Sequence, residues 1–284
     1  IRPCRGSRPC GPRTRGGEAG LHLAHHPEAA DPRPLAHQDA WLAGQPYGKA
    51  PVALHLTESK VNGLLNVTDV SGLTVGDYLN AQNLEAGTGS QGVDIQTNTQ
   101  VNVTEQIGLN AASLAMGSDS WLEAERVAIE TSGDVHHDTI RAKGDSSSQD
   151  LRILAGGSIE PIEADSLLRN QMGGTRLKAG TRIGASGDPV SLQVDRLHAD
   201  ARDGGLYLHS DSGIRFVDTS TATRSGSPAV GRITAGAITG ADLIADALTV
   251  EASRLTGSRL KARTDGLELA VSGLADVGQL TAGT

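Results

Sequence analysis

The sequence predicts an all-β solenoid, in which short strands stack as successive coils, and three observations support this class. A short pattern of inward apolar residues recurs in residues 153–159, 177–183 and 208–214. Apolar and polar residues alternate along each copy, which is typical of a strand. The chain also has 36 glycines in 284 residues and no sustained helical periodicity, and glycine disfavours helices. A repeat of roughly 20–30 residues that carries strands indicates stacked β-coils.

Composition and charge exclude other classes of protein. Only 2% of the residues are aromatic, and the formal net charge is -8. So few large rings cannot fill a wide core, whereas a narrow core lined by Leu, Ile, Val and Ala needs none. The acidic balance argues against a nucleic-acid partner. Membrane insertion is not expected, because the chain has no run of about 18 apolar residues.

The first fifty residues differ in kind from the rest. Residues 1–50 carry a net charge of +3 and hold seven of the 11 prolines and both cysteines, whereas residues 51–284 carry -11. Because this composition cannot bury a core, we expect residues 1–50 to be a disordered or loosely attached tail. Zinc binding there is disfavoured, since five residues separate the cysteines and two to four is the usual spacing. The ligands considered are Cys4, Cys10, His22, His25 and His26.

Residues 51–284 are expected to form the solenoid, with roughly eight to eleven coils spaced by about 4.8 Å. Gly, Asn, Asp, Ser and Thr connect the alternating segments, as tight turns require. Two polar stretches, residues 145–149 and 218–228, are expected to be corner loops. Inward positions are predicted at Leu54, Leu56, Leu65, Val67, Leu73, Val75, Val93, Ile95, Val101, Val103, Leu122, Ala124, Val127, Ile129 and Ile140.

The spacing changes over residues 231–262, where apolar residues recur every five positions. This spacing resembles the pentapeptide repeat, in which a central Leu points inward and which also builds a β-solenoid. Residues 266–274 return to the first pattern, and another coil begins just before the last residue, so we expect the natural protein to continue. The inward residues predicted here are Ile233, Ile238, Leu243, Leu248, Leu255 and Leu260, and then Leu267, Leu269, Val271 and Leu274.

Two phrases carry a family resemblance. Residues 183–197 read Ile-Gly-Ala-Ser-Gly-Asp-Pro-Val-Ser-Leu-Gln-Val-Asp-Arg-Leu, and residues 204–208 read Gly-Gly-Leu-Tyr-Leu. They resemble the recurring phrases of filamentous haemagglutinin-like adhesins, giant bacterial exoproteins exported by two-partner secretion. The resemblance is clear over residues 150–284 and looser over 51–149. It implies a right-handed parallel β-helix, a secreted or cell-surface location and a stalk or adhesive role. The family's secretion domain is not present, so an outer-membrane secretion partner is implied by analogy.

The function expected on these grounds is that of a non-catalytic stalk or adhesive segment of a large secreted bacterial surface protein. The outward side chains are mostly Thr, Ser, Asp, Arg and Lys. They suit a stiff spacer or a broad multivalent contact better than a catalytic cleft. Partners would be host-cell or matrix surface molecules or glycans. We assign no catalytic, metal-binding or cofactor-binding residue, and no cofactor.

Two other classes remain open. Many β-helical proteins cleave polysaccharides with paired carboxylates, about 5–10 Å apart, and stacked coils could supply such a pair. No aromatic platform for sugar rings accompanies the candidates, which favours solvated turn residues. A pentapeptide-repeat interaction protein would need the five-residue spacing throughout. The candidate carboxylates are Glu160, Glu163, Asp165, Asp195, Asp200, Asp242 and Asp246.

The pair His136 and His137 lies between Asp134 and Asp138, and all four are metal-ligand types. Neighbouring residues of a strand point to opposite faces, so their side chains would not converge on one ion. The favoured interpretation of this segment is an exposed turn.

Overall fold

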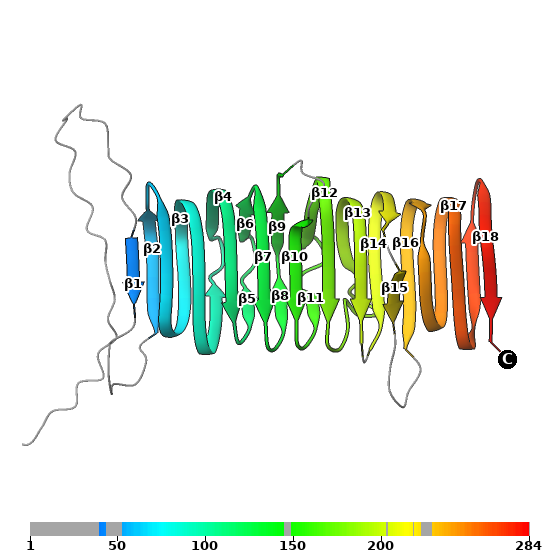
Figure 1. Ribbon diagram of the computed structural model, residues 1–284, viewed down its shortest axis with the longest axis horizontal. Coiled ribbons are helices and arrows are strands. Elements are labelled where there is room, and N and C mark those ends of the chain that lie inside the picture. Colours follow the sequence, from blue (N-terminus) through cyan, green and yellow to red (C-terminus); the bar gives the residue numbers. More distant parts are fainter. Residues whose placement is uncertain are drawn as a thin grey trace, which may run out of the picture.

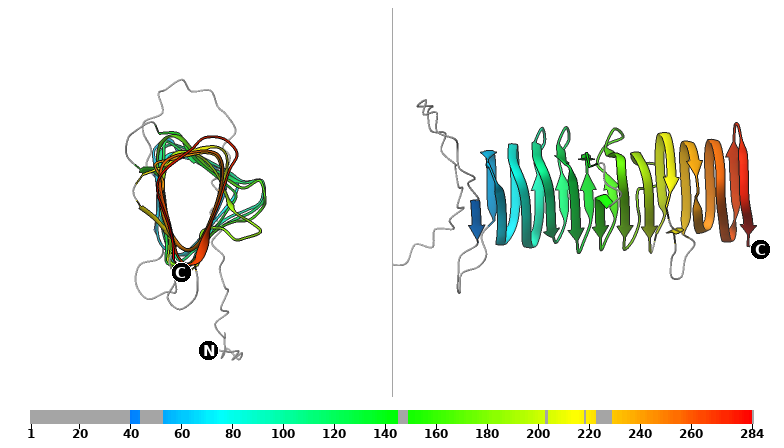
Figure 2. Two further views of the ribbon diagram at one scale, coloured as in Figure 1. Left: turned by 90° about the vertical axis from the view of Figure 1, so that its right-hand side faces the viewer. Right: turned by 45° about the horizontal axis from the view of Figure 1, so that its top comes forward.

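A computed structural model of the chain describes residues 40–43, 53–144, 149–202, 204–217, 219–222 and 229–283. Within these ranges the chain forms strands and turns but no helix, so none of them could cross a membrane as a helix. Parallel strands stack as a β-solenoid of about 10 turns, which confirms the predicted all-β class and the number of coils. The turns follow one another along a rod, and seen end-on they trace one closed outline (Figure 1 and Figure 2).

The described residues form 18 strands in one sheet, and neighbouring turns pair in parallel. In chain order the strands are β1 (Ala40–Ala43), β2 (Leu54–Lys60), β3 (Leu64–Ile95), β4 (Gln100–Ala111), β5 (Leu114–Met116), β6 (Trp121–Ala124), β7 (Arg126–Thr131), β8 (Val135–His137), β9 (Thr139–Ala142), β10 (Gln149–Ala155), β11 (Ile159–Pro161), β12 (Leu167–Ala179), β13 (Val190–Ala201), β14 (Leu206–Phe216), β15 (Thr219–Ala222), β16 (Val230–Thr239), β17 (Asp242–Val271) and β18 (Ala275–Ala282).

Alternation of apolar and polar side chains explains why these segments are strands. In β4 the buried Val101 and Val103 alternate with polar neighbours, and the buried Ile107 and Leu109 do the same after the chain turns a corner. Each side chain of this kind stabilises the fold by roughly 1.5–3 kcal/mol relative to the same side chain in water. The inward positions predicted between residues 56 and 140 are all buried, and Leu54 packs against them.

The core consists of aliphatic columns that run along the rod. Ile107 of β4 pairs with Val127 of β7, which pairs with Leu151 of β10. The second of these steps is longer in sequence than the first, so the turns differ in length. Ile153 pairs with Leu177 of the following turn, as the first two copies of the sequence repeat predict.

The third copy of the sequence repeat does not lie one turn after the second. Leu177 pairs with Ala199, whereas Leu208 pairs with Val190 and Ile233 in another column. Leu208 is buried nonetheless, as predicted. Strands on different sides of a coil alternate inward apolar and outward polar residues in the same way. One sequence pattern can therefore recur on two sides of the solenoid.

The six apolar residues with five-residue spacing are all buried, as predicted. Burial still alternates within each strand here, since Leu248, Val250 and Ala252 all point inward. Ile233 pairs with Val250, so this turn is shorter than the turn that joins Ile153 to Leu177. The five-residue spacing of apolar residues therefore arises from two features. Buried and exposed residues alternate within each strand, and corners separate one strand from the next.

The last described turn has a neighbour on one side only. Leu267, Leu269 and Val271 pack against the core but are only partly buried. The prediction that Leu274 points inward is wrong, because this residue is 58% exposed. The next residue, Ala275, pairs with the buried Leu255 of the preceding turn, so Leu274 does not occupy the inward position. Leu280 of β18 pairs with the buried Leu260 and is 52% exposed because no described turn packs over it.

Four residues of the predicted tail belong to the stack. β1 pairs in parallel with residues 65–68 of β3, and the rest of residues 1–50 lies outside the described residues. Of the two predicted corner loops, residues 145–148, 218 and 223–228 are also outside them. Contrary to the prediction, residues 219–222 form β15, which pairs with β13 and β17.

Candidate functional site

Most of the seven carboxylates singled out in the sequence lie in separate parts of the stack, where they bind the neighbouring turn. Asp246 is 9% exposed and accepts the Ala229 N–H at 2.8 Å. Asp200 lies beside Lys178 of the preceding turn. Three others form ion pairs with an arginine of the following turn, namely Glu160 with Arg182 at 2.7 Å, Asp195 with Arg215 at 3.0 Å and Asp242 with Arg259 at 2.8 Å.

The other two candidates, Glu163 and Asp165, lie close to Asp119 and Asp138, and we call these four residues the acidic corner. Burial raises the pKa of Asp138. The Ser120 N–H, which donates to Asp138 Oδ2 at 2.8 Å, opposes this rise. The negative charges of the other three carboxylates raise the pKa of Asp138 further. The corner can therefore hold a proton on Asp138 at a higher pH than an isolated Asp would.

Asp119 was not among the candidate residues identified from the sequence. Asp138 was considered there only as a possible metal ligand beside His136 and His137. Asp119, Asp138 and Glu163 are far apart along the chain, so they meet only because the turns between them have these particular lengths. The Ser118 hydroxyl donates a hydrogen bond to Glu163. Asp138 itself is only 7% exposed, so its carboxyl group is largely covered.

The prediction of an exposed turn at His136 and His137 is wrong, because both residues lie in β8. The side chain of His136 is 44% exposed and lies 4.0 Å from a Glu160 oxygen, whereas His137 is fully buried. Burial lowers the pKa of His137 to about 4, although a hydrogen bond to the Asp138 carbonyl at 2.8 Å raises it. Among the described residues, no cluster of three or more His, Cys, Asp or Glu side chains could hold a metal ion.

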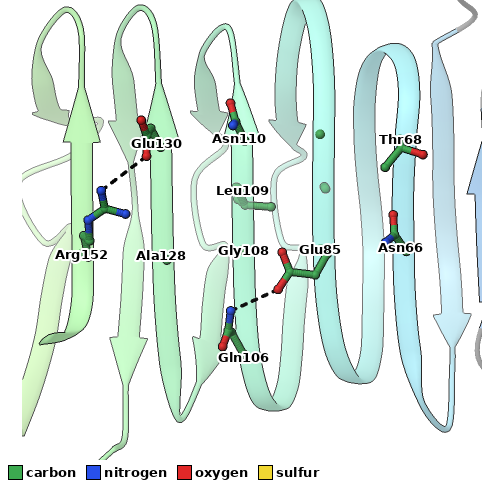
Figure 3. A pocket seen from close by; sticks show the side chains of 12 residues that line it. Asn66, Thr68, Glu85, Gln106, Gly108, Leu109, Asn110, Ala128, Glu130 and Arg152 are labelled. Carbon is green, nitrogen blue, oxygen red and sulfur yellow. Dashed lines mark hydrogen bonds and ion pairs between the residues drawn. The ribbon is translucent and has the colours of Figure 1, made fainter. Parts of the chain in front are cut away.

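A polar hollow of about 390 Å³ lies on the outer surface across β3, β4, β7 and β10 (Figure 3). One column of outward residues crosses it, formed by Glu85, Gly108, Ala128 and Arg152 on successive turns. The two small residues form the floor, and the longer ones form walls on either side. Asn66, Thr68, Gln106, Asn110 and Glu130 complete the polar lining.

Side-chain contacts order the walls of the polar hollow. Gln106 Nε2 donates to Glu85 Oε1 at 3.1 Å, and Arg152 lies 3.4 Å from Glu130 (Figure 3). A Cβ at Gly108 would lie 2.3 Å from Glu85 Oε2, so a larger residue there would displace the Glu85 carboxylate from this position. Such amides and carboxylates can hydrogen-bond to hydroxyl groups of a ligand, but they contain no activated nucleophile.

No pattern in the sequence pointed to the polar hollow. Its column joins residues of four successive turns, and this alignment depends on the register between turns. The potential zinc ligands Cys4, Cys10, His22, His25 and His26 lie outside the described residues. Comparison of the chain with known protein families, with curated proteins and with solved structures gave no match.

Proposed function

We propose that this chain is a non-catalytic stalk or adhesive segment of a large secreted bacterial surface protein. The observation that carries the proposal is that the charged side chains contact other parts of the solenoid. Five of the seven candidate carboxylates lie against a neighbouring turn, where they form an ion pair, accept a backbone hydrogen bond or lie beside a residue with which they pair in the sheet. The core is a continuous set of columns along the rod. A stack of this kind is stiff and presents a repetitive outer surface rather than a cleft.

The setting of such a segment is the cell surface or the extracellular space. The resemblance to filamentous haemagglutinin-like adhesins supports this setting, together with export through an outer-membrane partner. Partners would be host-cell or matrix surface molecules or glycans. Shallow sites such as the polar hollow bind weakly one at a time, and repetition along a rod raises the overall affinity through multivalency.

The acidic corner favours one alternative, a β-helical polysaccharide-cleaving enzyme. Glycoside hydrolysis by two carboxyl groups needs one that keeps its proton beside one that has lost it. The raised pKa of Asp138 beside Glu163 has this character. However, Asp138 is largely covered and its Oδ2 accepts the Ser120 N–H, so it has the contacts of a residue that stabilises the corner.

Incubation with a panel of acidic and neutral polysaccharides separates these two functions. We expect the purified chain to leave every polysaccharide uncleaved, as measured by the release of reducing ends and of unsaturated products. Cleavage by the parent chain that is lost in Glu163→Gln and Asp138→Asn, and retained in the ion-paired control Glu160→Gln, would establish the enzyme and overturn the stalk.

A further inference from the structure

Outward residues of β3, β4, β6, β9 and β12 form a second surface, which we call the aromatic face. Tyr78 pairs with Gln100, and Gln100 pairs with Trp121, so two aromatic rings stand two turns apart in one column. Tyr78 is 38% exposed and Trp121 is partly buried. Two strand spacings amount to about 9.6 Å, which is close to the length of a disaccharide unit in an extended polysaccharide.

Contacts with both neighbouring turns hold the indole ring of Trp121. Its Nε1–H donates to Asn102 Oδ1 at 3.2 Å, and Arg141 Cζ lies 5.8 Å from the centre of the ring. A guanidinium group at this distance is attracted to the ring, and the Arg141 side chain remains 38% exposed. The pair therefore presents an aromatic surface directly beside a fixed cation.

A cationic hollow of about 240 Å³ continues the aromatic face toward β12, and three cationic side chains and one carboxylate line it. Arg141 lies 3.6 Å from Glu123, and Lys143 bonds to the same carboxylate. The carboxyl group of Asp150 lies close to Gly144 and Gly173 at the edge of the hollow. Among the described residues the three cations still outnumber these two carboxylates, which leaves an excess of positive charge on a chain whose net charge is -8. Such a local excess attracts anionic ligands. The lining residues are Glu123, Arg141, Ala142, Lys143, Arg169 and Met172.

We propose that the aromatic face binds a linear acidic polysaccharide that runs along the rod. Its sugar rings lie against Tyr78 and Trp121, and a carboxylate or sulfate group of a following sugar binds in the cationic hollow. Three strand spacings, about 14 Å along the rod, separate Tyr78 from Arg141, so the ligand spans several sugar units. Apolar C–H faces of sugars pack against aromatic rings, and guanidinium groups bind carboxylates through paired hydrogen bonds.

Calorimetric titration with polysaccharides of different charge tests this site. We expect polygalacturonate and hyaluronan to bind, and dextran, which is neutral, to bind at least about tenfold more weakly, a difference of roughly 1.4 kcal/mol. Raising the salt concentration should weaken binding to the acidic polysaccharides, because salt screens exposed charges. Acidic oligosaccharides should bind more tightly from the disaccharide to the tetrasaccharide, and little more tightly beyond it.

Substitutions locate the site. Trp121→Ala and Arg141→Gln should each reduce the affinity for polygalacturonate by about tenfold or more. Arg232→Gln is the matched control, because Arg232 is half exposed and also faces a glutamate, Glu251 at 3.0 Å, but lies in β16, several turns away from the aromatic face. Tyr207→Ala removes an aromatic side chain from a different part of the rod. Both controls should bind like the parent, and circular dichroism should show the same strand content in all variants.

Four outcomes would overturn the ligand assignment. They are the absence of binding to both acidic polysaccharides by the folded chain, unchanged affinity in both site variants, equal binding of dextran, and equally tight binding of single-stranded DNA. This proposal depends on the adhesive function proposed above in one respect, namely that the polysaccharide is bound and not cleaved. Loss of polysaccharide binding alone would contradict the binding site but not the stalk function. Cleavage of a bound polysaccharide would contradict the stalk function but not the binding site.

Discussion

At the scale of single residues, the surroundings of His137 disfavour the protonated, charged form of its imidazole ring. It is fully buried beside Pro161 of the next turn. Its Nδ1–H donates to the Asp138 carbonyl, and its Nε2 has no hydrogen-bond partner among the described residues. A neutral imidazole tolerates this position, but an imidazolium would carry an unpaired buried charge.

We expect the free energy of unfolding to fall as the pH is lowered from 6.5 toward 4. Burial sets the pKa of His137 at about 4 in the folded chain, against 6.5 when unfolded. Its contribution is therefore fully present above pH 6.5 and is lost as the pH falls through 4, by roughly 3 kcal/mol. Asp138 acts in the opposite sense, because its raised pKa favours the folded state when it is protonated.

Urea unfolding of His137→Leu at a series of pH values checks this expectation. The variant should lose less stability than the parent between pH 7 and pH 4, since it has no imidazole to protonate. His55→Ala, in which an exposed histidine of β2 is removed, should keep the parent's pH dependence. Parallel curves for the parent and His137→Leu would show that another group controls acid unfolding.

The orientation of aliphatic residues could be predicted from the sequence, because alternation alone decides which face of a strand is buried. His137 carried the same signal, since Val135 two positions before it is also inward. Its polarity suggested a turn instead, and the fixed spacing of the strand proved stronger than the preference of imidazole for water. The prediction for Leu274 was wrong for a different reason, because the register between turns places its neighbour Ala275 opposite the buried Leu255, and alternation in the sequence does not fix that register.

At the scale of strands, each inward side chain packs between equivalent residues of the turns before and after it. Leu208 of β14 lies between Val190 of β13 and Ile233 of β16. The sequence predicted that Leu208 is inward, but the recurring pattern did not show that its column differs from that of Leu177. Register could not be predicted because the turns vary in length along the rod, and alternation does not record where a turn closes.

Leu208→Asp tests the packing of this column. Leu208 is 1% exposed, and a buried carboxylate without a partner costs several kcal/mol, so the variant should melt well below the parent. Ser191→Asp is the matched control, because Ser191 follows Val190 on the outward side of β13 and a charge there stays in water. Equal melting temperatures for the parent and Leu208→Asp would show that Leu208 does not face the core.

At the scale of the whole molecule, the sites are products of the stack. The acidic corner, the polar hollow and the aromatic face each join residues from three or more turns. The sequence contained all of these residues, yet their proximity requires the length of every intervening turn. Fold class could therefore be predicted from local alternation, whereas the surfaces could not.

Parallel pairing of successive turns has a mechanical consequence. The hydrogen bonds between turns point along the rod, and each turn is held only by its neighbours. A force applied through the two ends of the chain therefore acts first on a terminal turn, which can peel away while the others stay folded. A turn of about 20 residues, such as that from Leu109 to Ile129, releases about 70 Å of extended chain. Single-molecule pulling should accordingly show a series of small extensions, and one large rupture would contradict turn-by-turn unwinding. A rod built in this way lengthens under load in steps and can rewind when the load is removed.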